Sequence, residues 1–303
     1  MIPVEVHDYY IYGGILMENL LRPIYQERAS HSNTLGILMV EKEHPVSPVT
    51  DNFDVILFII VRNAEEAWYV KHYEYENKKA AMHIVDERLL NNWIETSGYR
   101  KVVQWIIEGK ILFDRNEYVS ELKERLYNFP EENRDLRKAI EFAKLIRAYR
   151  ECKNFYSSGQ HLDAYSMMVR SLHYLARLSV IEKGFYPEIT VWNQVKKIEP
   201  EIYKLYEEFT QSTEPTDKKV QLMLLASEYA INSRAEKSTR HLLKIMQTKH
   251  TPWSFGDLKV HPEIDKYALD LGALLEYLVE RNIVKVVKEE TKGKYIYHRK
   301  YKI

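Results

Sequence analysis

Cysteine is nearly absent from this chain of 303 residues: Cys152 is the single one, so the chain forms no internal disulfide and no cysteine-based zinc site. No run approaches the ~18 uncharged apolar residues that span a membrane. Residues 1–8 lack the basic and apolar regions of a signal peptide. A Gly-x-x-x-x-Gly-Lys loop is missing, as are two histidines at i and i+4 with a third ligand. We therefore expect a cytoplasmic protein without membrane association, P-loop chemistry, zinc, haem or flavin.

The chain has no formal net charge, because it contains 44 Lys and Arg residues and 44 Asp and Glu residues. The charge is not evenly distributed, however. Residues 1–115 carry 12 basic and 17 acidic side chains, whereas residues 116–249 carry 22 and 19. An acidic region followed by a basic one is compatible with a cleft that holds a metal-bound polyanion, and equally with chance.

The first 115 residues predict a domain that mixes helices and strands. Two continuous apolar runs, 35–40 and 53–61, are typical of strands buried on both faces. The pattern also predicts a helix over 9–30 that Pro23 bends or breaks, a hairpin of 68–76 with 80–85, a helix capped by Asp86, a helix over 100–107 and a strand over 110–114. We therefore expect an α+β domain over residues 1–115.

The rest of the chain predicts two further domains. Residues 116–240 are helical throughout, and the helix over 163–183 carries apolar side chains at three- and four-residue spacings, as in the core of a helical bundle. In residues 241–303, helices precede a basic hairpin of 283–287 with 295–299, which is the pattern of a winged helix. The predicted fold class is α+β: a mixed sheet with helices, a helical bundle and a C-terminal winged helix-turn-helix.

Asp54 lies where a loop leads into the second apolar run, and its position there resembles a known motif. With the preceding run Leu35-Gly36-Ile37-Leu38-Met39-Val40, it resembles the metal-binding strand of the polymerase-β-type nucleotidyltransferase superfamily. The order of elements through Asp114 is similar to nucleotidyltransferases of the kanamycin type, in which a helical bundle supplies the acceptor-binding wall. As a whole, the chain resembles uncharacterised bacterial nucleotidyltransferase-like proteins with a C-terminal winged helix.

The resemblance implies a site for Mg²⁺ and a nucleoside triphosphate in a cleft between the first two domains, with Asp54 as the main metal ligand and catalytic residue and Asp51 as the auxiliary one. The motif departs from the family pattern. Asn52 stands where the first carboxylate is expected, Val40-Glu41-Lys42 replaces a Gly-Ser turn, and the strand over 80–85 has no acid. Asp51 can assist only if residues 50–53 form a turn, because positions i and i+3 of a strand face opposite ways. Nucleotidyl transfer, ligand binding without turnover, and a purely structural role for both aspartates stay open.

The rival function is that of a catalytically inactive regulatory or assembly protein whose winged helix contacts nucleic acid or a protein partner. The helix over 270–282 is expected to expose Asp270, Glu276 and Glu280, which disfavours base reading. The hairpin predicts contact with a nucleic-acid backbone, indifferent to sequence, or a role in a homodimer. Its candidate residues for that contact are Lys285, Lys288, Lys292, Lys294 and Arg299. Separately, Arg234 and His241 have the spacing of a catalytic pair found in helical RNases.

Overall fold

The computed structural model describes residues 5–96, 98–129 and 131–303, without the side chains of residues 5–16, 132 and 133. The expectation that the N-terminal residues form no signal peptide concerns residues 1–4 in part, and these lie outside the described residues. The chain divides into two compact units, Met1–Phe129 and Pro130–Ile303. No helix in the described part of the chain is long and apolar enough to cross a membrane. The finer boundaries expected after residues 115 and 240 stay predictions.

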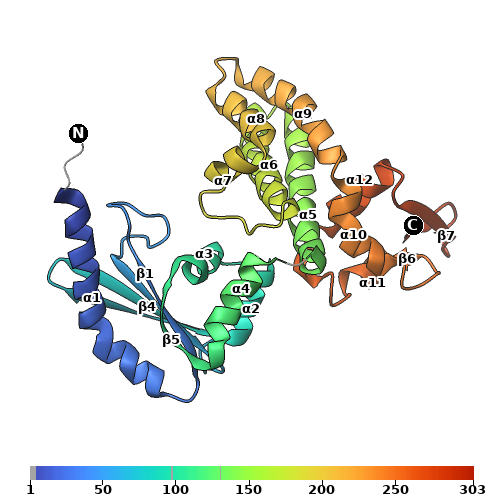
Figure 1. Cartoon of the computed structure of the whole chain (residues 1–303). Helices are drawn as coiled ribbons and strands as arrows, with labels where there is room; N and C mark the ends of the chain where they lie inside the picture. The colour runs from blue at the N-terminus through green and yellow to red at the C-terminus, as the bar shows by residue number, and fades with distance from the viewer. Residues whose placement is uncertain (1–4, 97, 130) are drawn as a thin grey trace. The chain divides into compact units, whose positions relative to one another are not determined.

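A five-stranded mixed sheet forms the centre of the first unit (Figure 1). Its strands are β1 (Thr34–Glu41), β2 (Val55–Val61), β3 (Trp68–Tyr75), β4 (Lys78–Asp86) and β5 (Lys110–Asp114), in the order β3-β4-β2-β1-β5. Strands β2 and β4 are parallel and the other neighbours are antiparallel. All seven residues of β2 are buried, as the continuous apolar run predicts. The strands β3 and β4 form the expected hairpin.

Helices cover both faces of this sheet. Helix α1 (Glu5–Ser30) packs on one face, where Leu21 and Tyr25 meet the odd-numbered side chains of β2. It does not end at Pro23. The other face carries α2 (Glu87–Thr96), α3 (Arg100–Glu108) and α4 (Tyr118–Tyr127), which follows the short 3₁₀ turn η1 (Arg115–Glu117). Phe58 of β2 contacts Trp105 of α3 on that face, with ring centroids 5.5 Å apart.

Local sequence explains how these helices begin and how closely they pack. The Asp86 carboxylate accepts a hydrogen bond from the Arg88 backbone N–H at 2.8 Å, which confirms Asp86 as the predicted cap of α2. Asp114, which precedes η1, accepts a hydrogen bond from the Val119 N–H in the first turn of α4 at 2.8 Å. A Cβ at Gly36 would lie 2.0 Å from Cγ2 of Val119, so glycine lets α4 pack directly against β1.

The second unit begins with a helical bundle. Its helices are α5 (Glu131–Ser157), α6 (His161–Glu182), α7 (Val191–Ile198), α8 (Pro200–Gln211), α9 (Thr216–Asn232) and α10 (Ala235–Met246). Met168, Leu172 and Leu175 of α6 are fully buried against α5 and its neighbours. The apolar stripe predicted for this helix therefore lies in the core.

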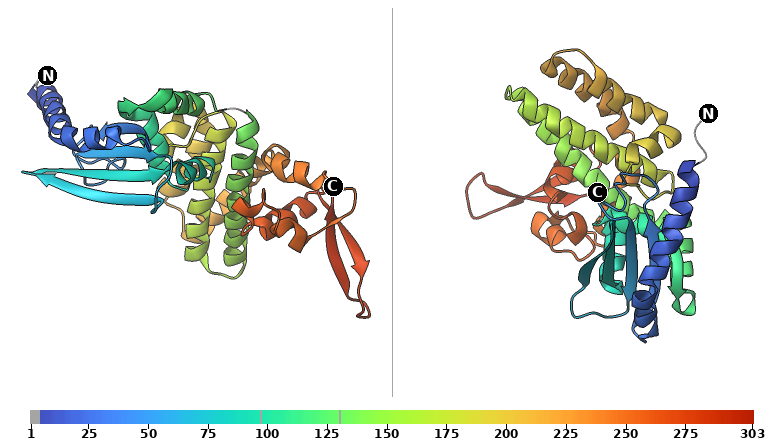
Figure 2. Two further views of the ribbon diagram at one scale, coloured as in Figure 1. Left: turned by 90° about the horizontal axis from the view of Figure 1, so that it is seen from below. Right: turned by 90° about the vertical axis from the view of Figure 1, so that its left-hand side faces the viewer.

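A helix-turn-helix region with a small sheet completes the second unit. It contains β6 (Trp253–Ser254), α11 (Phe255–Lys259), the 3₁₀ turn η2 (Asp265–Tyr267), α12 (Leu271–Glu280), β7 (Lys285–Glu290) and β8 (Tyr297–Lys302). The antiparallel strands follow the order β6-β8-β7. The hairpin of β7 and β8 extends away from the helices of its own unit (Figure 2). One core joins this region to the bundle. The predicted α+β fold class is thus confirmed.

Candidate functional site

A tight turn brings Asp51 and Asp54 to the same end of β2. The Phe53 backbone N–H donates a hydrogen bond to the Thr50 carbonyl at 3.0 Å, and Asp51 has a φ of 54°. Aspartate tolerates this left-handed conformation better than most side chains. Residues 50–53 therefore form the turn, and not the regular strand, that a joint role of the two aspartates requires.

Asp54 is held between the two strands that neighbour β2. Its backbone N–H donates to the Lys79 carbonyl at 2.8 Å, and the Lys42 N–H donates to its carbonyl at 2.9 Å. The Asp54 side chain uses Oδ2 to accept a hydrogen bond from the Lys79 N–H at 2.8 Å. No described residue donates a hydrogen bond to Oδ1. The half-buried Asp54 carboxylate therefore supports the start of β4 with one oxygen and keeps the other available.

Asp51 contacts helix α3 instead of the sheet. Its carboxylate forms an ion pair with Lys101 in the first turn of α3. Trp105, one turn further along, donates its indole N–H to the Val49 carbonyl at 2.9 Å. The same loop is thus attached to α3 at two points. The sequence did not reveal Lys101, because the partner lies 50 residues away from Asp51 and no motif marks it.

A group of aromatic rings fills the space between the sheet and helices α2 and α3. It comprises Trp68, His83, Trp93, Tyr99 and Trp105, with neighbouring ring centroids 4.8 to 5.9 Å apart. Trp68 donates its indole N–H to Nδ1 of His83 at 3.1 Å, which requires that nitrogen to be unprotonated. Burial is the main cause that lowers the pKa of His83 to about 4; His72 lowers it further, Asp51 opposes the shift, and Lys101 adds a smaller lowering effect. His83 is therefore neutral at pH 7.

A third carboxylate does not join Asp51 and Asp54. In the parallel pairing, Val55 lies opposite Ala80 and Val61 lies opposite Asp86. At about 3.3 Å per residue, Asp86 is thus about 20 Å from the Asp54 end of the sheet. No group of three or more metal-ligating His, Cys, Asp or Glu side chains occurs among the described residues. Any metal bound at the head of β2 would take at most two protein carboxylates from them.

Helix α12 in the second unit is fixed to α5 by ion pairs. Asp270 pairs with Arg147 at 3.0 Å and Glu280 with Arg150 at 2.7 Å. Asp270 is only 5% exposed, and its burial raises its pKa, with Arg147 opposing this shift. The expectation of an exposed acidic face was therefore wrong for Asp270. The wrong expectation arose because the sequence does not show that arginines of α5 lie opposite this helix.

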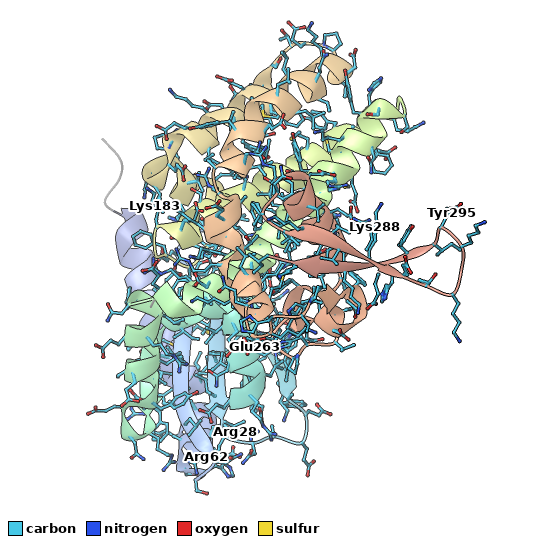
Figure 3. The ribbon with its side chains drawn as sticks, turned by 90° about the vertical axis from the view of Figure 1, so that its right-hand side faces the viewer. Arg28, Arg62, Lys183, Glu263, Lys288 and Tyr295 are labelled. Carbon is cyan, nitrogen blue, oxygen red and sulfur yellow. The ribbon has the colours of Figure 1, made fainter. Side chains whose placement is uncertain are left out.

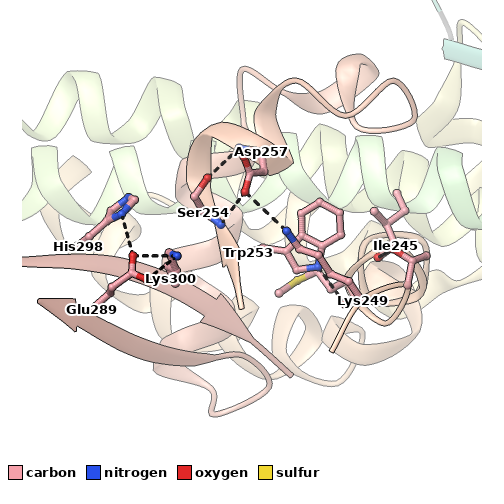
Figure 4. Close-up of polar contacts among 10 residues, drawn as sticks. Ile245, Lys249, Trp253, Ser254, Asp257, Glu289, His298 and Lys300 are labelled. Atoms are coloured by element: carbon pink, nitrogen blue, oxygen red, sulfur yellow. Dashed lines mark hydrogen bonds and ion pairs between the residues drawn. The ribbon is translucent and has the colours of Figure 1, made fainter. Parts of the chain in front are cut away.

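The hairpin of β7 and β8 exposes all five basic side chains expected there. Lys288 and Tyr295 project from it (Figure 3). Arg299 pairs with Glu276 of α12 at 3.0 Å. Near the base of the hairpin, Lys300 pairs with Glu289 at 2.8 Å, and Ser254 and Asp257 form a capping box at the start of α11 (Figure 4).

The chain is similar to known proteins over nearly its whole length. Family models match three consecutive stretches: a nucleotidyltransferase-like domain over residues 17–134, a YgxA-like substrate binding domain over 135–234 and a helix-turn-helix domain over 240–303. The chain is 47% identical over 285 residues to a Bacillus subtilis (strain 168) protein described as uncharacterized protein YgxA, covering 94% of this chain and 97% of the relative. The chain belongs to the YgxA-like family of nucleotidyltransferase-like proteins.

A solved structure supports the same family. The crystal structure of a nucleotidyltransferase-like protein from Exiguobacterium sibiricum 255-15 matches with a TM-score of 0.77 and 36% sequence identity, over 94% of this chain and 99% of that chain. The resemblance inferred from the sequence is thus confirmed. The chain is a nucleotidyltransferase-like protein with a substrate-binding domain and a C-terminal helix-turn-helix.

Arg234 and His241 do not share a partner in this family member. Arg234 pairs with Glu182 and Glu199, whereas Nδ1 of His241 lies 3.0 Å from the Tyr267 hydroxyl and Nε2 lies 3.6 Å from Glu263. Burial is the main cause of the lowered pKa of His241. These contacts give each side chain a structural role at a different place in the unit.

Proposed function

We propose that this protein binds a nucleoside triphosphate with Mg²⁺ at the head of β2, through Asp54 and Asp51. The proposal depends mainly on the turn over residues 50–53, which brings both aspartates to one strand end. Membership of a nucleotidyltransferase-like family supports it. Mg²⁺ is usually bound by one or two carboxylates together with substrate phosphates, so two aspartates are a sufficient protein contribution.

The arrangement of these contacts suggests how the side chains divide the task. Oδ1 of Asp54 is available as a metal ligand while Oδ2 stays on the Lys79 N–H. Asp51 would exchange its ion pair with Lys101 for the metal, and the released ammonium group of Lys101 would then contact a phosphate. Bound Mg²⁺ would supply charge neutralisation for the phosphates.

We expect binding without rapid nucleotidyl transfer. Two-metal catalysis needs ions about 3.5–4 Å apart that are held by shared carboxylates. Asn52 stands at one of the expected acidic positions, and β4 carries no acid near Asp54. A site with two protein carboxylates suits one Mg²⁺–nucleotide complex better than two metal ions.

A thermal-shift screen tests this proposal. ATP, GTP, CTP and UTP are each added at millimolar concentration with Mg²⁺, with Mn²⁺ or with EDTA. At about 100 times Kd, one nucleotide stabilises the folded protein by about 2.7 kcal/mol. We expect a shift that depends on the divalent cation, without release of pyrophosphate. If no nucleotide gives a cation-dependent shift, the proposal fails.

The second candidate function is nucleic-acid contact by the β7–β8 hairpin. Exposed basic residues stand beside exposed rings there: Tyr295 is 81% exposed, and Lys294 lies 5.4 Å from its ring centroid. Helix α12 packs against α5, and its charged side chains, Glu276 and Glu280, are both acids, so it offers no basic donor for base edges in a major groove. Contact through the hairpin would therefore be indifferent to sequence. Gel-shift titration with two unrelated duplexes tests this, and a strong preference for one would contradict it.

A further inference from the structure

A cavity of about 710 Å³ lies within the second unit. Its volume is in the range of pockets that enclose small organic ligands. Six basic side chains line it: Arg134, Lys138, Lys183, Arg234, Lys237 and Arg240. Three acidic ones, Glu131, Glu182 and Glu199, also line it. The cavity lining therefore carries a formal excess of three positive charges.

Ion pairs already engage all three acids of the cavity, although Glu182 and Glu199 share the single charge of Arg234. Arg234 binds Glu182 at 2.9 Å through Nε and binds Glu199 through Nη2, with both carboxylates mostly buried. Burial raises the pKa of Glu182 despite Arg234. For Glu199, burial also raises the pKa, but hydrogen bonds from Ser179 and Arg234 outweigh it and the net shift is downward. These acids hold the helices together and are not free to receive a cationic ligand.

Three of the basic side chains form no ion pair with a described residue: Arg134, Lys183 and Lys237. Nε of Arg134 is buried and has no hydrogen-bond partner among the described residues. The turn after α6 approaches its guanidinium so closely that a Cβ at Gly184, where φ is 88°, would lie 3.3 Å from Nη1. The Arg134 guanidinium thus lies against the Gly184 turn with one of its donors unsatisfied. A buried donor without a partner is costly, and a ligand oxygen would remove that cost.

We propose that this cavity binds the phosphate group of a small phosphorylated molecule, without a divalent cation. Arg134, with its buried Nε, and the exposed Lys183 and Lys237 line the same cavity and would share the contacts to one anionic group. Guanidinium and ammonium donors form strong charge-assisted hydrogen bonds with phosphate oxygens. Polycationic acceptors of the kanamycin type would be repelled by the same lining. This site is separate from the aspartates of β2, and its proposal does not depend on them.

Isothermal titration with inorganic pyrophosphate in EDTA tests the site in the full-length protein. We expect wild-type protein to bind pyrophosphate and the double variant Lys183→Gln/Lys237→Gln to bind at least about tenfold more weakly, because each substitution removes a hydrogen bond from a charged donor. Both lysines are exposed, so the variant should fold normally. Lys197→Gln/Lys204→Gln, which removes the same charge from exposed lysines of the same unit that do not line the cavity, is the matched control and should retain wild-type affinity.

The result is distinguishable from that of the nucleotide proposal. Asp54→Asn should leave pyrophosphate binding in EDTA unchanged, and kanamycin should not compete with it. The proposal is overturned if wild-type protein does not bind pyrophosphate in EDTA. The proposal is also overturned if the cavity double variant and the Lys197→Gln/Lys204→Gln control bind pyrophosphate with equal affinity, since the binding would then reflect general positive charge.

Discussion

The head of β2 and the cavity of the second unit differ in how they are built. Asp51 and Asp54 are close in sequence, and each has one side-chain contact that fixes it. The cavity draws its charges from segments that are distant in sequence, from Glu131 to Arg240, and links several of them into an ion-pair network. The site at the head of β2 can be recognised from a short sequence motif but offers only two carboxylates. The cavity offers more charged groups, but no sequence motif marks it.

Substitution of Arg234 by glutamine should produce the largest effect, because it leaves Glu182 and Glu199 as two mostly buried carboxylates without their counter-ion. Removal of one partner of a buried ion pair costs about 3 kcal/mol or more in unfolding free energy. The loss would be measured by urea denaturation followed by circular dichroism. Asp54→Asn, at the other site, should change the stability of the free protein by less than about 1 kcal/mol.

Arg240→Gln is the matched control for this comparison. Arg240 also lines the cavity, but its ion pair with Glu131 at 3.6 Å is exposed on both sides. Exposed ion pairs contribute about 0–1 kcal/mol. Equal losses for Arg234→Gln and Arg240→Gln would contradict the assignment of Arg234 as the central structural charge of the cavity.

A second prediction concerns pH and the first unit. The pKa of His83 falls from 6.5 to about 4 in the folded protein. Folded protein therefore binds fewer protons than unfolded protein in this range, so stability is complete above pH 6.5 and is lost as the pH falls towards 4. This one group accounts for up to about 3 kcal/mol of unfolding free energy.

The variant His83→Gln should remove that contribution while keeping an acceptor for the Trp68 indole N–H. Urea denaturation at about pH 7, 5.5 and 4.5 would compare the two proteins across the range in which the histidine titrates. We expect the wild type to lose more stability than the variant over this interval. Parallel losses would show that His83 is not the titrating group.

Substitutions in the β7–β8 hairpin should have the smallest effects. The hairpin is a second basic region but, unlike the cavity, it is exposed. Lys292→Gln/Lys294→Gln should weaken duplex DNA binding equally for all sequences. It should also reduce the log–log salt slope by about 0.9 for each phosphate that the variant no longer neutralises. Fluorescence anisotropy at several salt concentrations would measure this. A sequence-selective complex that survives ~0.5 M salt would contradict it.

Much of the first unit could be predicted from sequence alone. The apolar runs over 35–40 and 53–61 indicated β1 and β2, because a strand buried on both faces needs continuous apolar residues. Asp86 indicated the start of α2, because a helix cap is a local interaction. The sequence alone did not predict that β4 lies parallel to β2, a pairing between distant segments.

The other contacts that the sequence did not predict also join residues that are far apart in the sequence. Lys101 as the partner of Asp51, Arg147 as the partner of Asp270 and Arg134 as part of a cavity all depend on how helices pack. No spacing rule within one segment predicts such contacts. For the same reason, Asp270 was expected at the surface and lies buried.

The most direct test of the account is the melting temperature of wild-type and Asp54→Asn protein with ATP, measured once with Mg²⁺ and once with EDTA. Glu95→Gln, which neutralises an exposed acid on α2, serves as the control. The account predicts a higher melting temperature with Mg²⁺ for the wild type and Glu95→Gln, and no difference for Asp54→Asn. A difference that persists in Asp54→Asn, or that is absent from the wild type, would contradict nucleotide binding at the head of β2.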